Sequence, residues 1–350
     1  MNKKRRCINR ILALAFSSLL LLTACKKNVV VTGGFSEGEV FRINNLSCTR
    51  TEMNIYLSNM ANSYEATFGS EIWNTTAGDT TIEEAFKDTV LAKITRIKVL
   101  NLMAKDEKVS LSSDEKKSLK KASKAYIKSL SKEEKSILNA DEDTVYKMYS
   151  EYALAEKVYN SIVGEVELEI SDDDARSITV EQIFIKTYHE SSSGRLTDFS
   201  ASAKAEAANR ARDIREKAVS GTDFESLCAT YNEDLESTHT YRRGEMPAEY
   251  DAVAFELEEG EISDVIYTAD GYYILKCISA YERKSTAENR EAIINEAKMK
   301  AFEEKYEAFL PNVIASLNEK EWNEITIIHD DRVKNNSFFT IYTDIMIDGK

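Results

Sequence analysis

The sequence predicts an α+β protein in which a helical lobe, built from N-terminal helices and one C-terminal helix, carries an inserted α/β domain. Three observations support this fold class. Residues 40–165 show helical spacing of apolar side chains almost throughout, and residues 171–282 mix strand and helix patterns. Helical spacing returns from about Thr286 to Leu310, within a C-terminal segment placed at 285–318. Because helical sequence lies on both sides of the insert, we expect the two flanks to pack together as one lobe.

The first residues have the pattern of a bacterial export signal. A basic cluster precedes the apolar run Ile11–Leu22, which is too short for a permanent membrane span. The four residues from Leu22 to Cys25 resemble the lipobox of bacterial lipoproteins, in which cleavage exposes a cysteine that is then acylated. We therefore expect 1–24 to be a lipoprotein signal peptide, Cys25 to be the membrane anchor and 25–39 to be a tether. The alternative is an ordinary secretory peptide with an incidental cysteine.

The charge of the chain argues against a nucleic-acid partner. Removal of residues 1–24 takes away five positive charges and no negative ones, so the formal net charge falls from −14 to −19. Binding of nucleic-acid phosphates needs clustered Lys and Arg. The many Lys and Glu residues of the helices are most simply explained as solvated faces. No metal or cofactor is predicted, because the three histidines show no ligand spacing: His189, His239 and His329.

The cysteines predict a protein that is stabilised by its apolar core. Apart from Cys7 and Cys25, the chain has an odd set of three: Cys48, Cys228 and Cys277. An exported protein that used disulfides as its main cross-links would carry more. A Cys228–Cys277 bridge is one alternative, and two separate buried thiols are the preferred one.

Local signals place the elements of the helical lobe. Phe41–Ile43 reads as a short strand, and a helix over 141–163 has one apolar face. Phe86, Val90, Ile94 and Ile97 form the apolar stripe of a further helix. Capping boxes, which mark helix starts, occur at Thr49–Glu52, Ser112–Glu115 and Ser131–Glu134.

The pattern changes at Glu165, where we place a domain boundary. The insert is predicted to contain a strand over 178–188, helices over 201–220 and 223–231, and a strand over 272–277. The last helix ends before Pro311. The tail 319–350 has strand-like pieces at 325–328 and 338–342, and the sequence assigns it no role.

Several fragments between residues 178 and 280 follow one another in a family order. Gly221–Phe224 and Tyr231–Asp234 resemble a G-x-D-F…Y-S-x-D stretch, with Asn232 in place of the serine, and Arg243–Met246 resembles an R-G-x-M turn. Phe255–Ser263 then follows an F-x-L-x-x-G-E-x-S run. This ordered set resembles the parvulin (PpiC or rotamase) family of peptidyl-prolyl isomerases, which implies an α/β parvulin domain.

The resemblance implies catalysis of rotation about X-Pro bonds, which is slow enough without a catalyst to limit folding. Such a catalyst needs an apolar slot for the proline ring and a polar floor that favours the twisted amide. The slot positions of the family fall here on Met246, Tyr250 and Phe255. The floor positions fall on Asp234, Gln182 and Tyr273.

This sequence departs from the family pattern at the floor. Gln182 and Tyr273 occupy the positions of the two family histidines, and the family's G-G-x-L-G loop is replaced by Leu235–Thr240. Gln and Tyr both form hydrogen bonds, but neither titrates near neutral pH as His does. The departures therefore predict an isomerase whose activity is weak or lost.

The predicted function is that of an extracytoplasmic foldase lipoprotein similar to the PrsA group. The resemblance implies a SurA-like chaperone lobe that binds unfolded, Pro-containing exported polypeptides at the outer face of the cytoplasmic membrane. Two alternatives remain: a non-enzymatic holdase chaperone, and a solute-binding lipoprotein, which would need two α/β lobes. The sequence leaves open whether the chain forms a homodimer.

Overall fold

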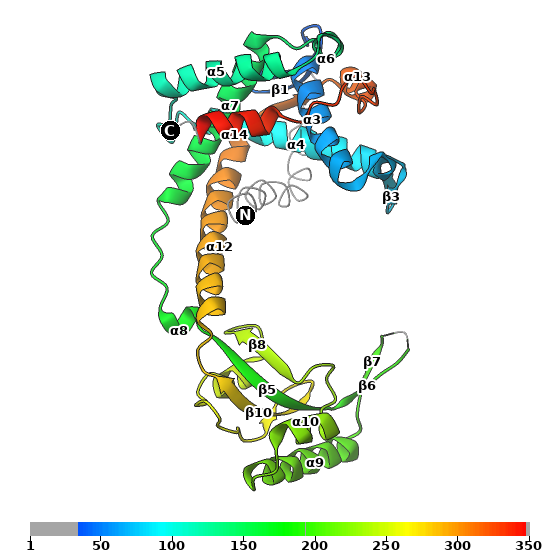
Figure 1. The fold of residues 1–350 in the computed structure, drawn as a ribbon, viewed down its shortest axis with the longest axis vertical. Helices are drawn as coiled ribbons and strands as arrows, with labels where there is room; N and C mark the ends of the chain where they lie inside the picture. The colour runs from blue at the N-terminus through cyan, green and yellow to red at the C-terminus, as the bar shows by residue number, and fades with distance from the viewer. Residues whose placement is uncertain (1–33, 193, 348–350) are drawn as a thin grey trace. The chain divides into compact units, whose positions relative to one another are not determined.

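The computed structural model describes residues 34–192 and 194–347, and these fall into two compact units (Figure 1). Unit 1 contains the chain up to Val166 and again from Lys300, and unit 2 is Glu167–Met299. The predicted signal peptide, Cys25 and most of the tether lie outside the described residues. No helix within the described part is both long and apolar enough to span a bilayer. The predicted fold class, a helical lobe with an α/β insert, is confirmed.

A small antiparallel sheet in unit 1 joins two distant segments of the chain. Its strand order is β11 (Ala315–Leu317), β1 (Glu39–Ile43) and β2 (Leu46–Thr49). Phe41 pairs with Leu317, and the Asn318 side-chain amide donates a 2.9 Å hydrogen bond to the Glu39 carbonyl oxygen. The segment that follows α12 (Arg283–Phe309) is therefore an integral part of unit 1.

The helices of unit 1 begin where the sequence signals place them. The predicted capping boxes at Thr49, Ser112 and Ser131 are all present, and Asp141 caps the helix predicted from its apolar face. A fourth box, at Thr81, was not predicted. The end of α12, from Lys300, also belongs to unit 1 and buries Phe302 and Tyr306 in its core. The α-helices that lie wholly in unit 1 are α3 (Arg50–Phe68), α4 (Ile82–Met103), α5 (Ser113–Ser129), α6 (Lys132–Leu138), α7 (Glu142–Gly164), α13 (Glu319–Glu324) and α14 (Phe338–Met346), with the short hairpin β3 (Thr76–Ala77) and β4 (Thr80–Thr81) before α4.

The tail was predicted wrongly as strand-like. Residues 338–342 form the start of α14, and 325–328 have no regular structure. Phe338 is fully buried, and its ring centroid lies 4.4 Å from that of Tyr149 and 5.2 Å from that of Tyr126. Tertiary packing outweighs the strand preference of these residues, because a helix places Phe338 and Tyr342 on one face toward the core.

Unit 2 is built on a four-stranded antiparallel sheet with helices on both faces. The strand order is β8–β5–β10–β9. Side chains alternate along β5, so that Ile183 and Ile185 face α9 and α10, while Val180 and Phe184 face α11. The bounds are α8 (Asp172–Ala175), β5 (Ser177–Lys186), β6 (Tyr188–Glu190), β7 (Leu196–Asp198), α9 (Ala201–Val219), α10 (Phe224–Tyr231), β8 (Thr238–Arg242), α11 (Ala248–Ala254), β9 (Ile266–Tyr267) and β10 (Gly271–Ser279).

Two features of this sheet follow from close packing. Cys228 and Cys277 belong to the cores on opposite faces of the sheet and are separate buried thiols, as preferred from the sequence. Gly271, at the start of β10, lies so close to β5 that a Cβ atom would be 2.2 Å from the Ile185 carbonyl oxygen. A side chain at this position would push β10 away from β5.

Candidate functional site

The candidate site lies on the face of the unit 2 sheet that α11 covers. Strand β5 supplies Gln182, which has the same parity as Val180 and Phe184 and so points to this face. Strand β10 supplies Tyr273, α11 supplies Tyr250, and Asp234 comes from the loop after α10. Segments far apart in the sequence thus converge on one sheet face.

The side-chain amide of Gln182 is the centre of a hydrogen-bond network. Its Nε2 donates to Asp234 Oδ2 at 2.9 Å. Its Oε1 accepts from the hydroxyl groups of Tyr250, at 3.0 Å, and Tyr241, at 3.2 Å. Gln182 is only 1% exposed, so these bonds are formed away from water, where a lost partner is costly.

The two tyrosines determine which way the Gln182 amide points. Burial raises the pKa of Tyr241 to about 12, and it raises the pKa of Tyr250 well above the ordinary value. Both phenols therefore stay protonated at neutral pH and can donate. Two donors at Oε1 turn the amide NH₂ group toward the Asp234 carboxylate. The network thus sets the position of the carboxylate through Gln182.

The loop that carries Asp234 is held by its own polar contacts. The Leu235 backbone N–H donates to Asp234 Oδ1 at 2.8 Å. Asn232 ties the loop to β5, since its Oδ1 accepts from the Phe184 N–H at 2.9 Å and its Nδ2 donates to the Glu236 carbonyl oxygen at 3.0 Å. The Asp234 side chain is 38% exposed. Of the three predicted floor residues it is the one able to touch a substrate.

Tyr273 takes part in a chain of stacked rings. It is 7% exposed, and burial raises the pKa of its hydroxyl above the ordinary value. Its ring stacks on Phe184 with centroids 4.5 Å apart and meets Tyr250 edge-on at 5.2 Å. Tyr250 in turn meets Tyr241 edge-on at 5.5 Å. The structure thus places Tyr273 as an aromatic wall beside the Gln182 network.

The residues predicted for the proline slot differ in their exposure. Met246 is partly exposed, whereas Tyr250 is fully buried and Phe255 is 2% exposed. The guanidinium groups of Arg243 and Arg176 lie 4.4 Å and 5.4 Å from the centre of the Phe255 ring. Met246 therefore offers surface to a ligand, while Tyr250 and Phe255 support it from the interior.

Two residues of the site were missed from the sequence, and both lie on β8. Tyr241 donates to Gln182, and the His239 ring stacks on Tyr241 with centroids 5.4 Å apart. His239 Nε2 lies 3.7 Å from Asp234 Oδ2. The alternation of residues 238–242 could have indicated this, because it places both side chains on the face that Gln182 shares. The comparison with the family pattern treats Leu235–Thr240 only as the replacement of a loop.

The raised pKa of the Tyr241 hydroxyl makes the stability of unit 2 depend on pH. A pKa raised from 10 to about 12 gives stability that is complete below pH 10 and is lost as the pH rises through 12. We expect Tyr241→Phe to lose less free energy of unfolding than the wild type between neutral pH and about pH 11. Urea unfolding followed by circular dichroism measures this difference. Tyr281→Phe, which removes the hydroxyl of a 46% exposed tyrosine, is the control and should behave as the wild type; equal pH dependence in all three proteins would refute the prediction.

The described residues contain no group of three or more His, Cys, Asp or Glu side chains arranged to hold a metal ion. The polar side chains of the candidate site bond to one another through hydrogen bonds of an amide, a carboxylate and two phenols. Such groups can orient a carbonyl group and stabilise partial charges.

Comparison with known proteins identifies unit 2. Residues 183–279 match the family described as rotamase, the PPIC-type PPIase domain. The chain is 34% identical over 92 residues to foldase protein PrsA 4 of Bacillus cereus, a match that covers 25% of this chain and 33% of the relative. It is 31% identical over 94 residues to foldase protein PrsA of Geobacillus kaustophilus, covering 25% and 34%. The matched segment thus spans about a third of the length of these curated relatives.

A solved structure gives a longer but more distant match. The crystal structure of peptidylprolyl isomerase (PrsA) from Bacillus cereus aligns over 90% of this chain and 98% of its own, with 17% sequence identity and a TM-score of 0.36. The sequence matches confirm the resemblance drawn from the ordered motifs. Residues 183–279 of this chain therefore form a PPIC-type peptidyl-prolyl isomerase domain.

Proposed function

We propose that this chain is an extracytoplasmic folding factor that binds unfolded, Pro-containing exported polypeptides and accelerates their peptidyl-prolyl cis-trans isomerisation. The observation that supports the proposal most is the Asp234–Gln182 pair, at 2.9 Å, within a PPIC-type domain. Tyr241 and Tyr250 hold this pair from behind. Met246 supplies apolar surface on the same core.

Prolyl isomerisation is a rotation about the C–N bond, so the protein needs to form no covalent bond to the substrate. The barrier of ~18–20 kcal/mol comes from amide resonance, which gives the C–N bond partial double-bond character. Resonance also places partial negative charge on the carbonyl oxygen. A carboxylate beside that oxygen disfavours the planar amide and so favours the twisted one in which resonance is broken. In the proposal Asp234 supplies this charge while Met246 contacts the proline ring.

Gln182 acts as a positioning residue in this scheme. It is buried, and its Nε2 holds one oxygen of Asp234 while the Leu235 N–H holds the other. A carboxylate fixed at both oxygens keeps its orientation without reorganising during rotation of the substrate. His239, 3.7 Å from the same carboxylate, adds a further polar group at the exposed edge.

Met246→Ala tests the substrate contact. We expect kcat/KM for a Pro-containing peptide to fall about tenfold, mainly through a higher KM, because the proline ring loses an apolar partner worth ~1.5 kcal/mol. A protease-coupled assay of prolyl isomerisation measures it. Met299→Ala removes a methionine of similar partial exposure outside the site and is the matched control. If Met246→Ala behaves as Met299→Ala, the slot is not at Met246.

The proposed location is the outer face of the cytoplasmic membrane, with the chain anchored through an acylated Cys25. The lipobox-like Leu22–Cys25 and the preceding basic and apolar segments support it. The first strand of unit 1, β1, begins at Glu39, where the tether 25–39 ends, so the tether would hold unit 1 near the bilayer.

A holdase without isomerase activity is the second candidate, and one feature of unit 1 favours it. Tyr64 and Phe68 near the end of α3 are 36% and 64% exposed, and Tyr64 packs on the buried rings of Trp73 and Phe86. Exposed aromatic side chains on a rigid support are suited to binding unfolded chains. Suppression of client aggregation with no acceleration of isomerisation above the thermal rate would favour this candidate over the isomerase.

The solute-binding alternative finds no support in the fold. It requires two similar α/β lobes, and the described part of unit 1 is helical, with only short strands.

A further inference from the structure

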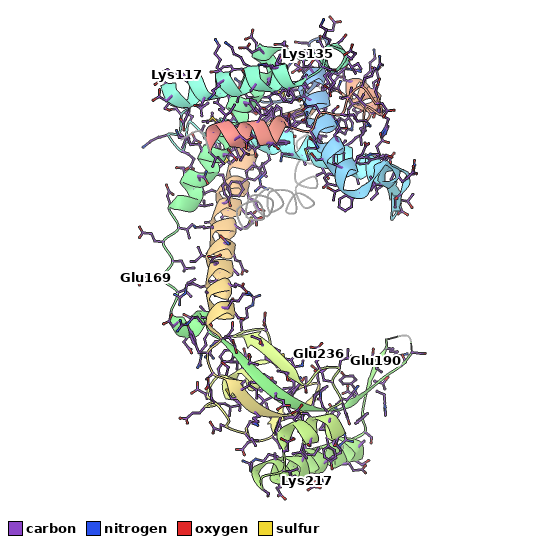
Figure 2. The ribbon with its side chains drawn as sticks, viewed as in Figure 1. Lys117, Lys135, Glu169, Glu190, Lys217 and Glu236 are labelled. Carbon is purple, nitrogen blue, oxygen red and sulfur yellow. The ribbon has the colours of Figure 1, made fainter. Side chains whose placement is uncertain are left out.

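One exposed face of α5 in unit 1 carries a dense array of lysines. Figure 2 labels Lys117 on this helix. All the lysines of α5 are exposed: Lys116, Lys117, Lys120, Lys121, Lys124 and Lys128. They lie within four turns of one helix in a chain whose formal net charge is −14. The array is therefore a positively charged region on a protein whose net charge is negative.

The helical geometry puts these lysines on a single side. At 100° per residue they fall within an arc of about 140°, and the buried residues of the helix occupy the opposite arc. Those buried residues are Leu119, Ala122, Ser123 and Tyr126. Helix α5 packs with them against α7 and α14. The lysine side chains consequently project away from the core of unit 1.

Most of this charge has no partner within the protein. Lys117 lies 2.9 Å from Asp114, and within the described residues no carboxylate lies within 4.0 Å of the other five lysines. Glu115, at the start of the helix, pairs instead with Lys157 of α7 at 2.8 Å. Five like charges held without counter-charges repel one another, and an external anion would relieve that repulsion.

The composition of the face indicates which kind of anion fits. None of the large apolar side chains that are exposed on the described surface belongs to α5, so the face lacks the anchors that a polypeptide partner would use. The lysines span about 18 Å along a convex helix, with no concave site for a small anion. Such an array matches an extended plane of negative charge.

We propose that the lysine face of α5 binds the anionic phospholipid surface of a membrane through the phosphate groups of its lipids. The predicted tether, 25–39, reaches at most about 50 Å when fully extended and leads directly into unit 1. Electrostatic attraction to a charged bilayer acts over only about 8 Å at physiological salt. A tether of this length lets the lysine face come within that range, and the contact would then orient unit 1 on the membrane.

The test uses vesicles and the chain from Lys26 to Lys350, which keeps every described residue and removes the acyl anchor from the measurement. Co-sedimentation compares vesicles of phosphatidylcholine alone with vesicles that also contain phosphatidylglycerol. We expect the chain to partition to the anionic vesicles and to be released by salt. Substituting glutamine for Lys120, Lys121 and Lys124 together should weaken this partitioning by about 10- to 100-fold.

The matched control replaces three other exposed lysines of unit 1 that have no ion pair within the described residues: Lys105, Lys300 and Lys320. It changes the net charge equally and should stay within twofold of the wild type. Equal loss in both variants would show that only net charge matters and would overturn the proposal, as would equal binding to both kinds of vesicle. Release of the chain by millimolar soluble glycerol phosphate would also overturn it, since a single phosphate would then suffice.

Discussion

Gln182→Leu is expected to lower kcat/KM for prolyl isomerisation by about 100-fold, the magnitude typical of removing one preorganised hydrogen-bond donor from an active site. Leucine has nearly the same size but can neither donate to Asp234 nor accept from Tyr241 and Tyr250. The Asp234 carboxylate would then lose the contact that fixes one of its oxygens. The loss should be in kcat, because Gln182 is buried and does not touch the substrate.

The controls separate positioning from folding. Gln182→Leu removes the acceptor of the buried Tyr250 hydroxyl and of the partly exposed Tyr241 hydroxyl, so its folded fraction must be checked by urea unfolding before rates are compared. Gln182→His restores a side chain that can donate to Asp234 and should recover most of the activity. Tyr250→Phe removes one of the two donors to Oε1 and should cost less than Gln182→Leu. A Gln182→Leu protein that is folded and fully active would show that the network does not contribute to catalysis.

The sequence predicts well those features whose cause is local. The capping boxes at Thr49, Ser112 and Ser131 start helices in the structure because the bonds they make involve only residues three apart. The strand over 178–188 is found as β5, followed by the short β6, because a buried strand needs a run of apolar residues. The ordered motifs of the central segment correctly identified the PPIC-type domain.

Features decided by tertiary contacts were not predicted. Residues 338–342 have the composition of a strand, and only their burial against Tyr126 and Tyr149 makes the helix the better choice. The positions of Tyr241 and His239 depend on the pairing of β8 with β5, which places Tyr241 opposite Ile178 and His239 opposite Val180. A contact between strands about 60 residues apart leaves no mark in local periodicity.

The family pattern directed attention to the two positions at which this chain replaces a family histidine. Gln182 and Tyr273 were expected to share one hydrogen-bonded floor. The structure joins Gln182 to Tyr241 and Tyr250, and packs Tyr273 between Phe184 and Tyr250. The histidine that lies nearest Asp234 comes from a different strand than either family position, so comparing positions one by one could not find it.

Lys98→Met is expected to lower the free energy of unfolding of unit 1 by about 3–5 kcal/mol, the usual cost of breaking a buried ion pair. Lys98 is fully buried, and its Nζ lies 2.6 Å from Glu151 and 3.3 Å from Glu52. Burial alone would lower the pKa of Lys98, but these two carboxylates outweigh it and the pKa is raised. Burial likewise works to raise the pKa of Glu52, and Lys98 with Lys147 outweighs it, so that this pKa is lowered.

The three shifts do not all favour the folded state at neutral pH, because burial raises the pKa of Glu151 while the pKa of Glu52 is lowered and that of Lys98 is raised. Glu151 therefore offsets part of the stability that Lys98 and Glu52 contribute. A raised lysine pKa stabilises the fold below about pH 10.5, and a lowered glutamate pKa stabilises it above about pH 4.5, so both contributions are present between these limits. In Lys98→Met the buried carboxylate of Glu52 and the largely buried one of Glu151 face each other with only the half-exposed Lys147 nearby. Lys147→Met should therefore cost only about 1 kcal/mol, as for a pair that water screens.

Tryptophan fluorescence during urea unfolding measures this loss in unit 1 alone, because the chain has two tryptophans, Trp73 and Trp322, and both lie in unit 1. Adding Glu151→Gln to Lys98→Met should restore part of the stability, since it removes one of the two facing charges. Prolyl isomerisation by unit 2 should be unchanged under native conditions. Equal destabilisation by Lys98→Met and Lys147→Met would contradict the prediction, and a parallel loss of isomerase activity would mean that the two units do not fold independently.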